Sequence, residues 1–363
     1  MFKIDTITAW LERYCTDIKV IDDEICFSFS DTRMWLKADS FTHSANLSAE
    51  VLDYGAHDDD EQECIYSGEE LANVMTANMY PYAFIWDDLN RTIASRKIFD
   101  IRNKSHFELL LKVEIVRMFY LSQQAEKVFF VGKNTDFPDD ENWMQFLLMV
   151  IDKWVAGDVL NMRILYLHGF ASSGNSGTAK EIQECLPNCK VISPDLPIHP
   201  SEALALIHKI IDEQEIDLVI GTSMGGYFAA QISDTMKILV NPSFHVSRMM
   251  KDRLGNNYEM TIPYFKQRED GATEFVLNKE IANWYFALER NIEKCAFAAN
   301  RCKIETLGVF GTDDDIVDCR EEYLSMYENI RYFQGGHRLN KEAVEEVIIP
   351  SILQMVINSY KND

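Results

Sequence analysis

The stretch VIGTSMGGYF, residues 219–228, sets one serine between two glycines at the end of an apolar run. Residues 217–220 are typical of a buried strand and residues 224–233 of a helix, so Ser223 falls on the turn between them. A G-x-S-x-G turn of this kind lifts the serine hydroxyl above the end of a sheet. Side chains in place of Gly221 and Gly225 would collide across such a tight turn. Ser223 is therefore a candidate nucleophile, and a glycine-rich turn that binds phosphate or nothing is the alternative.

A serine nucleophile needs a base and an acid. In proteins that use this turn the order along the chain is serine, acid, histidine. His337, in FQGGH at 333–337, is the one histidine that follows a plausible acid. Three other histidines come too early in the chain: His199, His208 and His245. The acid lies in GTDDDIVD at 311–318, where its role would be to hold the imidazole tautomer and stabilise the imidazolium.

A tetrahedral intermediate also needs hydrogen-bond donors for its oxyanion. One donor is expected to be the backbone N–H of Met224, the residue after the serine. The other is expected to be the N–H of Phe170, in the loop LHGFASSG at 167–174. In this interpretation His168 is a structural histidine of the turn. The competing interpretation, a phosphate-binding loop, is weakened because the loop lacks the lysine and the glycine spacing of known phosphate motifs.

The second half of the chain predicts a parallel sheet covered by helices on both faces. Short apolar runs alternate there with longer amphipathic stretches, which is typical of an α/β fold. The expected strands are residues 163–167, 190–193, 217–220, 237–240, 306–310 and 331–333. A polar and aromatic insertion at about 244–302 interrupts this alternation and is expected to form a cap over the serine.

The first half has a different pattern. It predicts a separate α+β domain with antiparallel strands, expected near residues 18–29, 33–38, 47–53, 82–87, 91–100 and 127–131. Helices are expected at 4–14, 106–123 and 143–154, and no active site of its own is evident. We therefore expect two domains, residues 1–156 and residues 162–363, that are joined by a short linker.

Composition narrows the classes of function. The chain has 363 residues, 47% of them hydrophobic, and a formal net charge of −23. So much negative charge makes nucleic acid and anionic membranes poor partners. The chain has no apolar run long enough for a membrane helix and does not open with a secretory signal, so we expect a cytoplasmic protein. Eight cysteines lack the spacing of a zinc site and are expected to be free thiols, and we expect neither a cofactor nor a metal.

Residues 162–363 resemble the α/β-hydrolase superfamily, and within it the small YqiA-type bacterial esterases. The resemblance rests on five segments, ILYLHGFASS at 164–173, IGTSMGG at 220–226, ILVNPS at 238–243, GTDDDIVD at 311–318 and GGH at 335–337. The family spacing G-x-x-D-x-x-V favours Asp314 as the acid, and Asp315 and Asp313 remain alternatives. Residues 1–160 are only faintly similar to YbjN and secretion-chaperone modules, which makes that domain a candidate for binding a protein partner.

The resemblance implies a serine esterase acting on small acyl esters through Ser223, His337 and Asp314. An acyltransferase or thioesterase could use the same three residues, because water and another acceptor would attack the acyl-enzyme in the same way. A hydrolase fold that serves only as a binding scaffold is the third hypothesis. The sequence does not distinguish the acyl chain that such an enzyme would accept.

Overall fold

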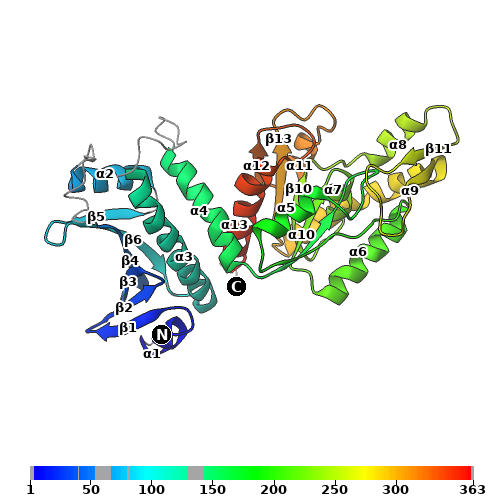
Figure 1. Cartoon of the computed structure of the whole chain (residues 1–363). Helices are drawn as coiled ribbons and strands as arrows, with labels where there is room; N and C mark the ends of the chain where they lie inside the picture. The colour runs from blue at the N-terminus through cyan, green and yellow to red at the C-terminus, as the bar shows by residue number, and fades with distance from the viewer. Residues whose placement is uncertain (1–3, 40, 54–66, 80–81, 130–142, 361–363) are drawn as a thin grey trace. The chain divides into compact units, whose positions relative to one another are not determined.

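The chain folds into two compact units. The computed structural model describes residues 4–39, 41–53, 67–79, 82–129 and 143–360 (Figure 1). One unit comprises Met1–Val159 together with Ile352–Asp363, and the other comprises Leu160–Ser351. The sequence places the second domain at 162–363, whereas the structure groups the residues after 351 with the first unit. Within the described ranges, no helix has the length and apolar character that crossing a membrane requires.

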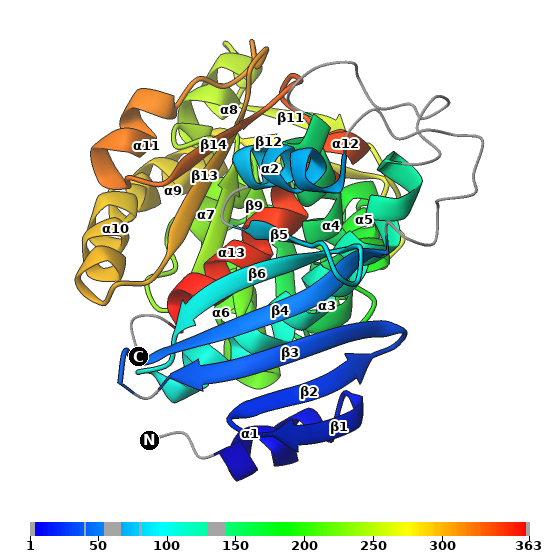
Figure 2. The same ribbon diagram turned by 90° about the vertical axis from the view of Figure 1, so that its left-hand side faces the viewer.

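The first unit is built on an antiparallel sheet. Its strands lie in the order β1-β2-β3-β4-β6-β5, as Figure 2 shows. They are β1 (Thr16–Ile21), β2 (Glu24–Phe29), β3 (Thr32–Asp39), β4 (Ser44–Asp53), β5 (Ala83–Asp87) and β6 (Thr92–Asp100). Buried and half-buried residues alternate along β4, with Ala45, Leu47 and Ala49 in the core. This alternation is what a sheet with one covered face requires.

Four described helices belong wholly to this unit, and two of them make the main contacts with the sheet. The four are α1 (Ile4–Leu11), α2 (Gly68–Asn78), α3 (Lys104–Phe129) and α4 (Trp143–Val159), and α3 packs on β4, β2 and β6. The expected strand at 127–131 is wrong for residues 127–129, which continue α3, and residues 130–131 lie outside the described ranges. The sequence-based expectations also omit α2, whose N-terminus is fixed by a capping box between Ser67 and Glu70.

A buried ionic cluster joins β6, α3 and α4 within the first unit. Glu114, which is 1% exposed, accepts hydrogen bonds from Tyr82 at 2.6 Å and Lys97 at 2.6 Å, and it also pairs with Arg117. Arg117 in turn donates to Asp152 at 2.7 Å. Burial alone would raise the pKa of Glu114, but Arg117 and Lys97 outweigh burial and lower that pKa. The carboxylate is thus held in its charged form inside the unit.

The second unit contains the expected parallel sheet, which confirms the predicted fold class. Its strands lie in the order β14-β13-β10-β9-β7-β8. They are β7 (Arg163–Leu167), β8 (Lys190–Ile192), β9 (Leu218–Thr222), β10 (Met236–Val240), β13 (Thr306–Gly311) and β14 (Ile330–Phe333). The helices are α5 (Gly177–Cys185), α6 (Pro200–Gln214), α7 (Met224–Ala229), α11 (Arg320–Met326), α12 (Lys341–Ala343), a π-helical turn η2 (Val344–Ile348) and the start of α13 (Ile349–Ser359). Leu165, Val219 and Leu239 of the central strands are completely buried, as expected for a sheet covered on both faces.

The insertion between β10 and β13 is an ordered subdomain. It contains α8 (Val246–Leu254), the antiparallel hairpin β11 (Glu259–Pro263) and β12 (Glu274–Asn278), then α9 (Lys279–Glu289) and α10 (Asn291–Arg301). The side chain of Tyr285 on α9 is completely buried, and its hydroxyl lies 3.6 Å from the sulfur of Met224. The hydroxyl of Tyr227 donates to the carbonyl of Tyr285 at 3.0 Å. The insertion is therefore packed directly onto α7, the helix that follows Ser223.

Candidate active site

Ser223 occupies the turn between β9 and α7 in a strained conformation. Its φ of 53° and ψ of −116° are outside the regions that non-glycine residues normally adopt. Its N–H donates to the carbonyl of Val240 at 3.0 Å, which ties the turn to the end of β10. A Cβ on Gly221 would lie 2.3 Å from the carbonyl oxygen of Gly225, and a Cβ on Gly225 would lie 1.9 Å from that of Leu167. Only glycine can occupy these two positions while the turn keeps its shape.

Two hydrogen bonds connect Ser223, His337 and Asp314. The imidazole Nε2 of His337 lies 2.9 Å from the hydroxyl of Ser223, and its Nδ1 lies 2.8 Å from Asp314 Oδ2. The side chains of His337 and Asp314 are only 14% and 5% exposed. The second oxygen of Asp314 accepts the backbone N–H groups of Ile316 at 2.9 Å and Val317 at 3.1 Å. The carboxylate is thereby held in one orientation, with one oxygen for the imidazole.

The neighbouring aspartates have other partners. Asp313 accepts a hydrogen bond from the side chain of Gln334 at 2.8 Å, and Asp318 pairs with Arg320. Asp315 is exposed. Of the three histidines set aside above, His245 lies 2.9 Å from Glu322, the ring of His199 is tilted against that of Trp284, and His208 is exposed on α6.

Asn241, at the end of β10, holds the two loops that carry Asp314 and His337. Its side chain accepts the N–H of Gly311 at 2.9 Å and donates to the carbonyls of Gly336 at 3.2 Å and His337 at 3.0 Å. It is 1% exposed and has a φ of 40°, a conformation that asparagine tolerates better than most residues. In the sequence Asn241 appeared only as part of the segment ILVNPS that carries the family resemblance, and this positioning role was missed.

The loop after β7 passes beside the serine. A Cβ on Gly169 would lie 3.9 Å from the hydroxyl of Ser223. Within the described structure, the backbone N–H groups of Phe170 and Met224 have no backbone acceptor. Met224 is the first residue of α7, and the first N–H groups of a helix have no acceptor inside the helix. One of these N–H groups follows Ser223 directly in the chain, and the other belongs to the residue after Gly169 in the neighbouring loop.

His168 is part of the loop's scaffold. It is 3% exposed, its Nε2 accepts the N–H of Leu196 at 3.1 Å, and its Nδ1 lies 2.9 Å from the carbonyl of Gly169. With Nε2 as the acceptor, Nδ1 carries the proton and donates to that carbonyl. Burial lowers the pKa of His168, so the imidazole is kept neutral.

A second link joins the same loop to the insertion. Asp195 accepts the N–H of Gly174 at 2.6 Å with one oxygen and the N–H of Glu269 at 2.7 Å with the other. The guanidinium of Arg268 lies 3.8 Å from Asp195 and donates to the carbonyl of Leu196 at 3.0 Å. The loop beside Ser223 is therefore fixed from two directions, by the sheet and by the β11–β12 turn.

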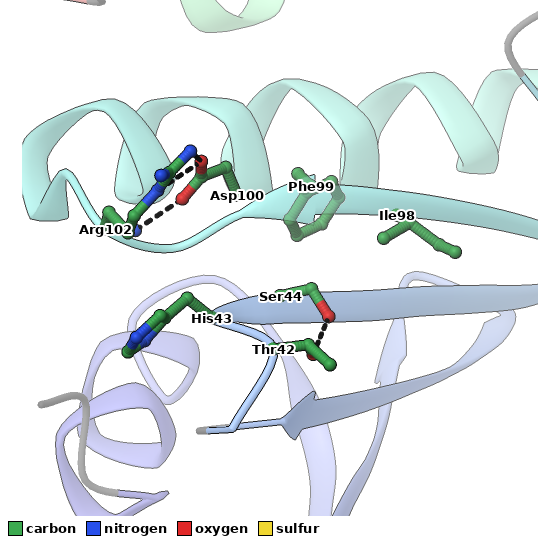
Figure 3. A pocket seen from close by; sticks show the side chains of 7 residues that line it. All are labelled: Thr42, His43, Ser44, Ile98, Phe99, Asp100 and Arg102. Carbon is green, nitrogen blue, oxygen red and sulfur yellow. Dashed lines mark hydrogen bonds and ion pairs between the residues drawn. The ribbon is translucent and has the colours of Figure 1, made fainter.

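The first unit has a hollow of its own, shown in Figure 3, with a volume of about 330 Å³. Its lining residues are Thr42, His43, Ser44, Ile98, Phe99, Asp100 and Arg102. The polar groups there mainly bind one another, since Arg102 donates to Asp100 at 2.7 Å and the hydroxyls of Thr42 and Ser44 lie 2.7 Å apart. His43 is exposed and forms no hydrogen bond or ion pair with the other residues drawn in Figure 3. We assign no chemistry to this hollow.

The parallel sheet, the strained serine turn and the loops at its carboxyl edge define an α/β-hydrolase fold. The chain belongs to the uncharacterised protein family UPF0227, whose family model matches residues 163–345. This agrees with the resemblance found in the sequence.

Solved structures similar to this chain include several hydrolases. One is the monoacylglycerol lipase of Paleococcus ferrophilus, 18% identical over 54% of this chain and 94% of the lipase, with a TM-score of 0.41. Another is Est1E from Butyrivibrio proteoclasticus, 16% identical over 55% of this chain and 90% of its own, with a TM-score of 0.42. A third is the thioesterase domain from the curacin biosynthetic pathway, which is 15% identical over 54% of this chain and 91% of the thioesterase domain, with a TM-score of 0.37.

Proposed function

We propose that the protein is a serine hydrolase that cleaves small acyl esters through an acyl-enzyme intermediate. One observation carries the proposal, the hydrogen-bonded series from Asp314 through His337 to the strained Ser223. A serine hydroxyl is a weak nucleophile until an adjacent base takes its proton, and an oriented imidazole at 2.9 Å is such a base. A binding scaffold would not require this arrangement.

In the proposed reaction the Ser223 hydroxyl attacks the acyl carbon while His337 Nε2 takes its proton. The negative charge that develops on the carbonyl oxygen is stabilised by the N–H groups of Met224 and Phe170. The imidazolium of His337 then gives the proton to the leaving alcohol, and Asp314 stabilises its positive charge without taking up a proton itself. Water activated by the same imidazole attacks the acyl-enzyme in the second half, which releases the acid and restores Ser223.

A fluorophosphonate probe and para-nitrophenyl acetate test this proposal on the full chain. We expect the probe to label Ser223 and the ester to be hydrolysed, and we expect Ser223→Ala to abolish labelling and lower kcat/KM at least about 10³-fold. Ser325→Ala is the matched control, because this exposed serine on α11 donates only to the carbonyl of Glu322. Hydrolysis by Ser223→Ala at the wild-type rate, or a folded wild-type protein that the probe leaves unlabelled, would refute the proposal.

A further inference from the structure

Two arginine side chains near the loops of the candidate active site have no acidic partner among the residues that the structure describes. The guanidinium of Arg338 lies 5.4 Å from the ring centre of Phe265, and that of Arg253 lies 5.3 Å from the ring centre of Phe170. Both arginines are exposed, and neither forms an ion pair or a side-chain hydrogen bond with another described residue. Among the other described arginines of the second unit, Arg163, Arg268 and Arg320 pair with acids, whereas Arg248, Arg290 and Arg301 do not.

The two arginines reach the loop after β7 from different elements. Arg338 follows His337, whose loop begins after β14, whereas Phe170 belongs to the loop after β7. In the sheet order, β9 with its serine lies between these two strands. The N–H of Phe265 donates to the carbonyl of Ala171 at 2.8 Å, so the ring that Arg338 covers is itself attached to the loop of Phe170. Arg338 therefore extends from the histidine loop across toward the opposite loop.

The positive charges of Arg338 and Arg253 lie in a strongly acidic chain. The whole chain carries a net charge of −23, which repels anions at long range. A guanidinium attracted to a ring by a cation–π contact keeps N–H groups that can donate to a ligand. Those N–H groups match the oxygens of a carboxylate or a phosphate in a two-pronged hydrogen bond. Two guanidiniums at the loops that flank Ser223, with no acidic partner among the described residues, suit an anionic ligand.

We propose that Arg338, assisted by Arg253, recognises an anionic group on the ester substrate, a carboxylate or a phosphate. This inference rests on the proposed function and deepens it, because it names the substrate class. The anion belongs either to the acyl chain or to the alcohol, and the guanidinium chemistry is the same in both cases. Exposed arginines that only cover aromatic rings would give no such preference.

Two pairs of esters separate the two sources of charge. For the acyl side, mono-para-nitrophenyl adipate is compared with the neutral para-nitrophenyl isooctanoate. For the alcohol side, para-acetoxybenzoate is compared with its methyl ester. The measured quantity is the ratio of kcat/KM for the anionic ester to that for the neutral ester, in wild type and variants. A ratio cancels any change that affects both esters of a pair equally.

We expect Arg338→Gln to lower the ratio about tenfold in at least one pair, the size of a partly exposed charged hydrogen bond. Arg253→Gln should lower the ratio of the same pair, and added salt should weaken the wild-type preference. Arg301→Gln is the matched control. This substitution removes the same charge from an exposed residue at the C-terminal end of α10. Arg301 comes just before β13, whereas the loop that carries Asp314 comes just after it, so Arg301 lies at the opposite end of that strand from the candidate site.

The inference is wrong if Arg338→Gln and Arg253→Gln leave both ratios within about twofold of wild type. It is also wrong if Arg301→Gln lowers a ratio as much as they do, because overall charge would then explain the effect. In either case labelling of Ser223 and hydrolysis of the neutral esters would still stand as support for the proposed function. If none of the four esters is hydrolysed and Ser223 is not labelled, the proposed function fails and the inference fails with it.

Discussion

Replacing Asn241 by alanine would test how the candidate site is held together. The substitution removes three hydrogen bonds, one from Gly311 and two to the carbonyls of Gly336 and His337. The N–H of Gly311 is buried, so leaving it without an acceptor costs about 1–3 kcal/mol. The two carbonyls are half-buried and can regain water, so each adds about 0.5 kcal/mol. Alanine at a φ of 40° adds about 1 kcal/mol of backbone strain.

The expected loss is therefore about 3–5 kcal/mol in the free energy of unfolding, measured by urea denaturation. Asn241→Gly is the matched control, because glycine also lacks the side-chain hydrogen bonds but adopts a positive φ without strain. The glycine variant should therefore lose about 1 kcal/mol less free energy of unfolding than the alanine variant. Hydrolysis of a neutral ester should fall about 10–100-fold, since His337 would no longer be held at its hydrogen-bond distance from Ser223. Wild-type stability and wild-type kcat in Asn241→Ala would refute the positioning role.

Two further predictions concern buried charges. Glu114→Gln leaves Lys97 and Arg117 without their shared buried carboxylate, so it should lower the free energy of unfolding by about 3 kcal/mol. Glu50→Gln is the control, because its partner Arg33 is exposed, and it should lower the free energy of unfolding by less than about 0.5 kcal/mol. Equal losses in urea denaturation would contradict this. Burial lowers the pKa of Lys237 from 10.5 to about 8, so between those pH values the unfolded chain binds more protons and stability rises with pH. Methionine at this position carries no charge, so the stability of Lys237→Met relative to wild type should increase by about 3 kcal/mol from pH 10.5 to pH 7. A difference independent of pH would count against a buried charge.

The second unit was predictable because its signals are local. Strands that are buried on both faces appear as short apolar runs such as RILYL at 163–167, and the serine turn has a fixed glycine spacing. Chain order then restricted the choice of histidine and acid. The order of the sheet strands brings residues 223, 314 and 337 to one edge, and the structure gives the two hydrogen bonds between them.

Long-range contacts were not predictable in this way. Asn241 acts on residues 70, 95 and 96 positions further along the chain, and no local pattern encodes those contacts. The residues next to Lys127–Phe129 favour a strand, but in the structure Lys127–Phe129 extend the helix α3. Extending an existing helix costs much less free energy than starting a new one, so the helix continues there. The sequence-based expectations omitted α2, although SGEE at 67–70 has the spacing of a capping box, a pattern that indicates the start of a helix.

The first unit takes residues from both ends of the chain, because α13 begins in one unit and continues into the other. During synthesis on a ribosome, Met1–Val159 emerges first but lacks the residues after 351 that belong to the same unit. The unit that carries Ser223 is contiguous in sequence, and all of it has been translated before those last residues appear. The second unit can therefore form from one continuous segment, whereas the first unit is complete only when the residues after 351 join a segment that ends at Val159, across the whole sequence of the second unit.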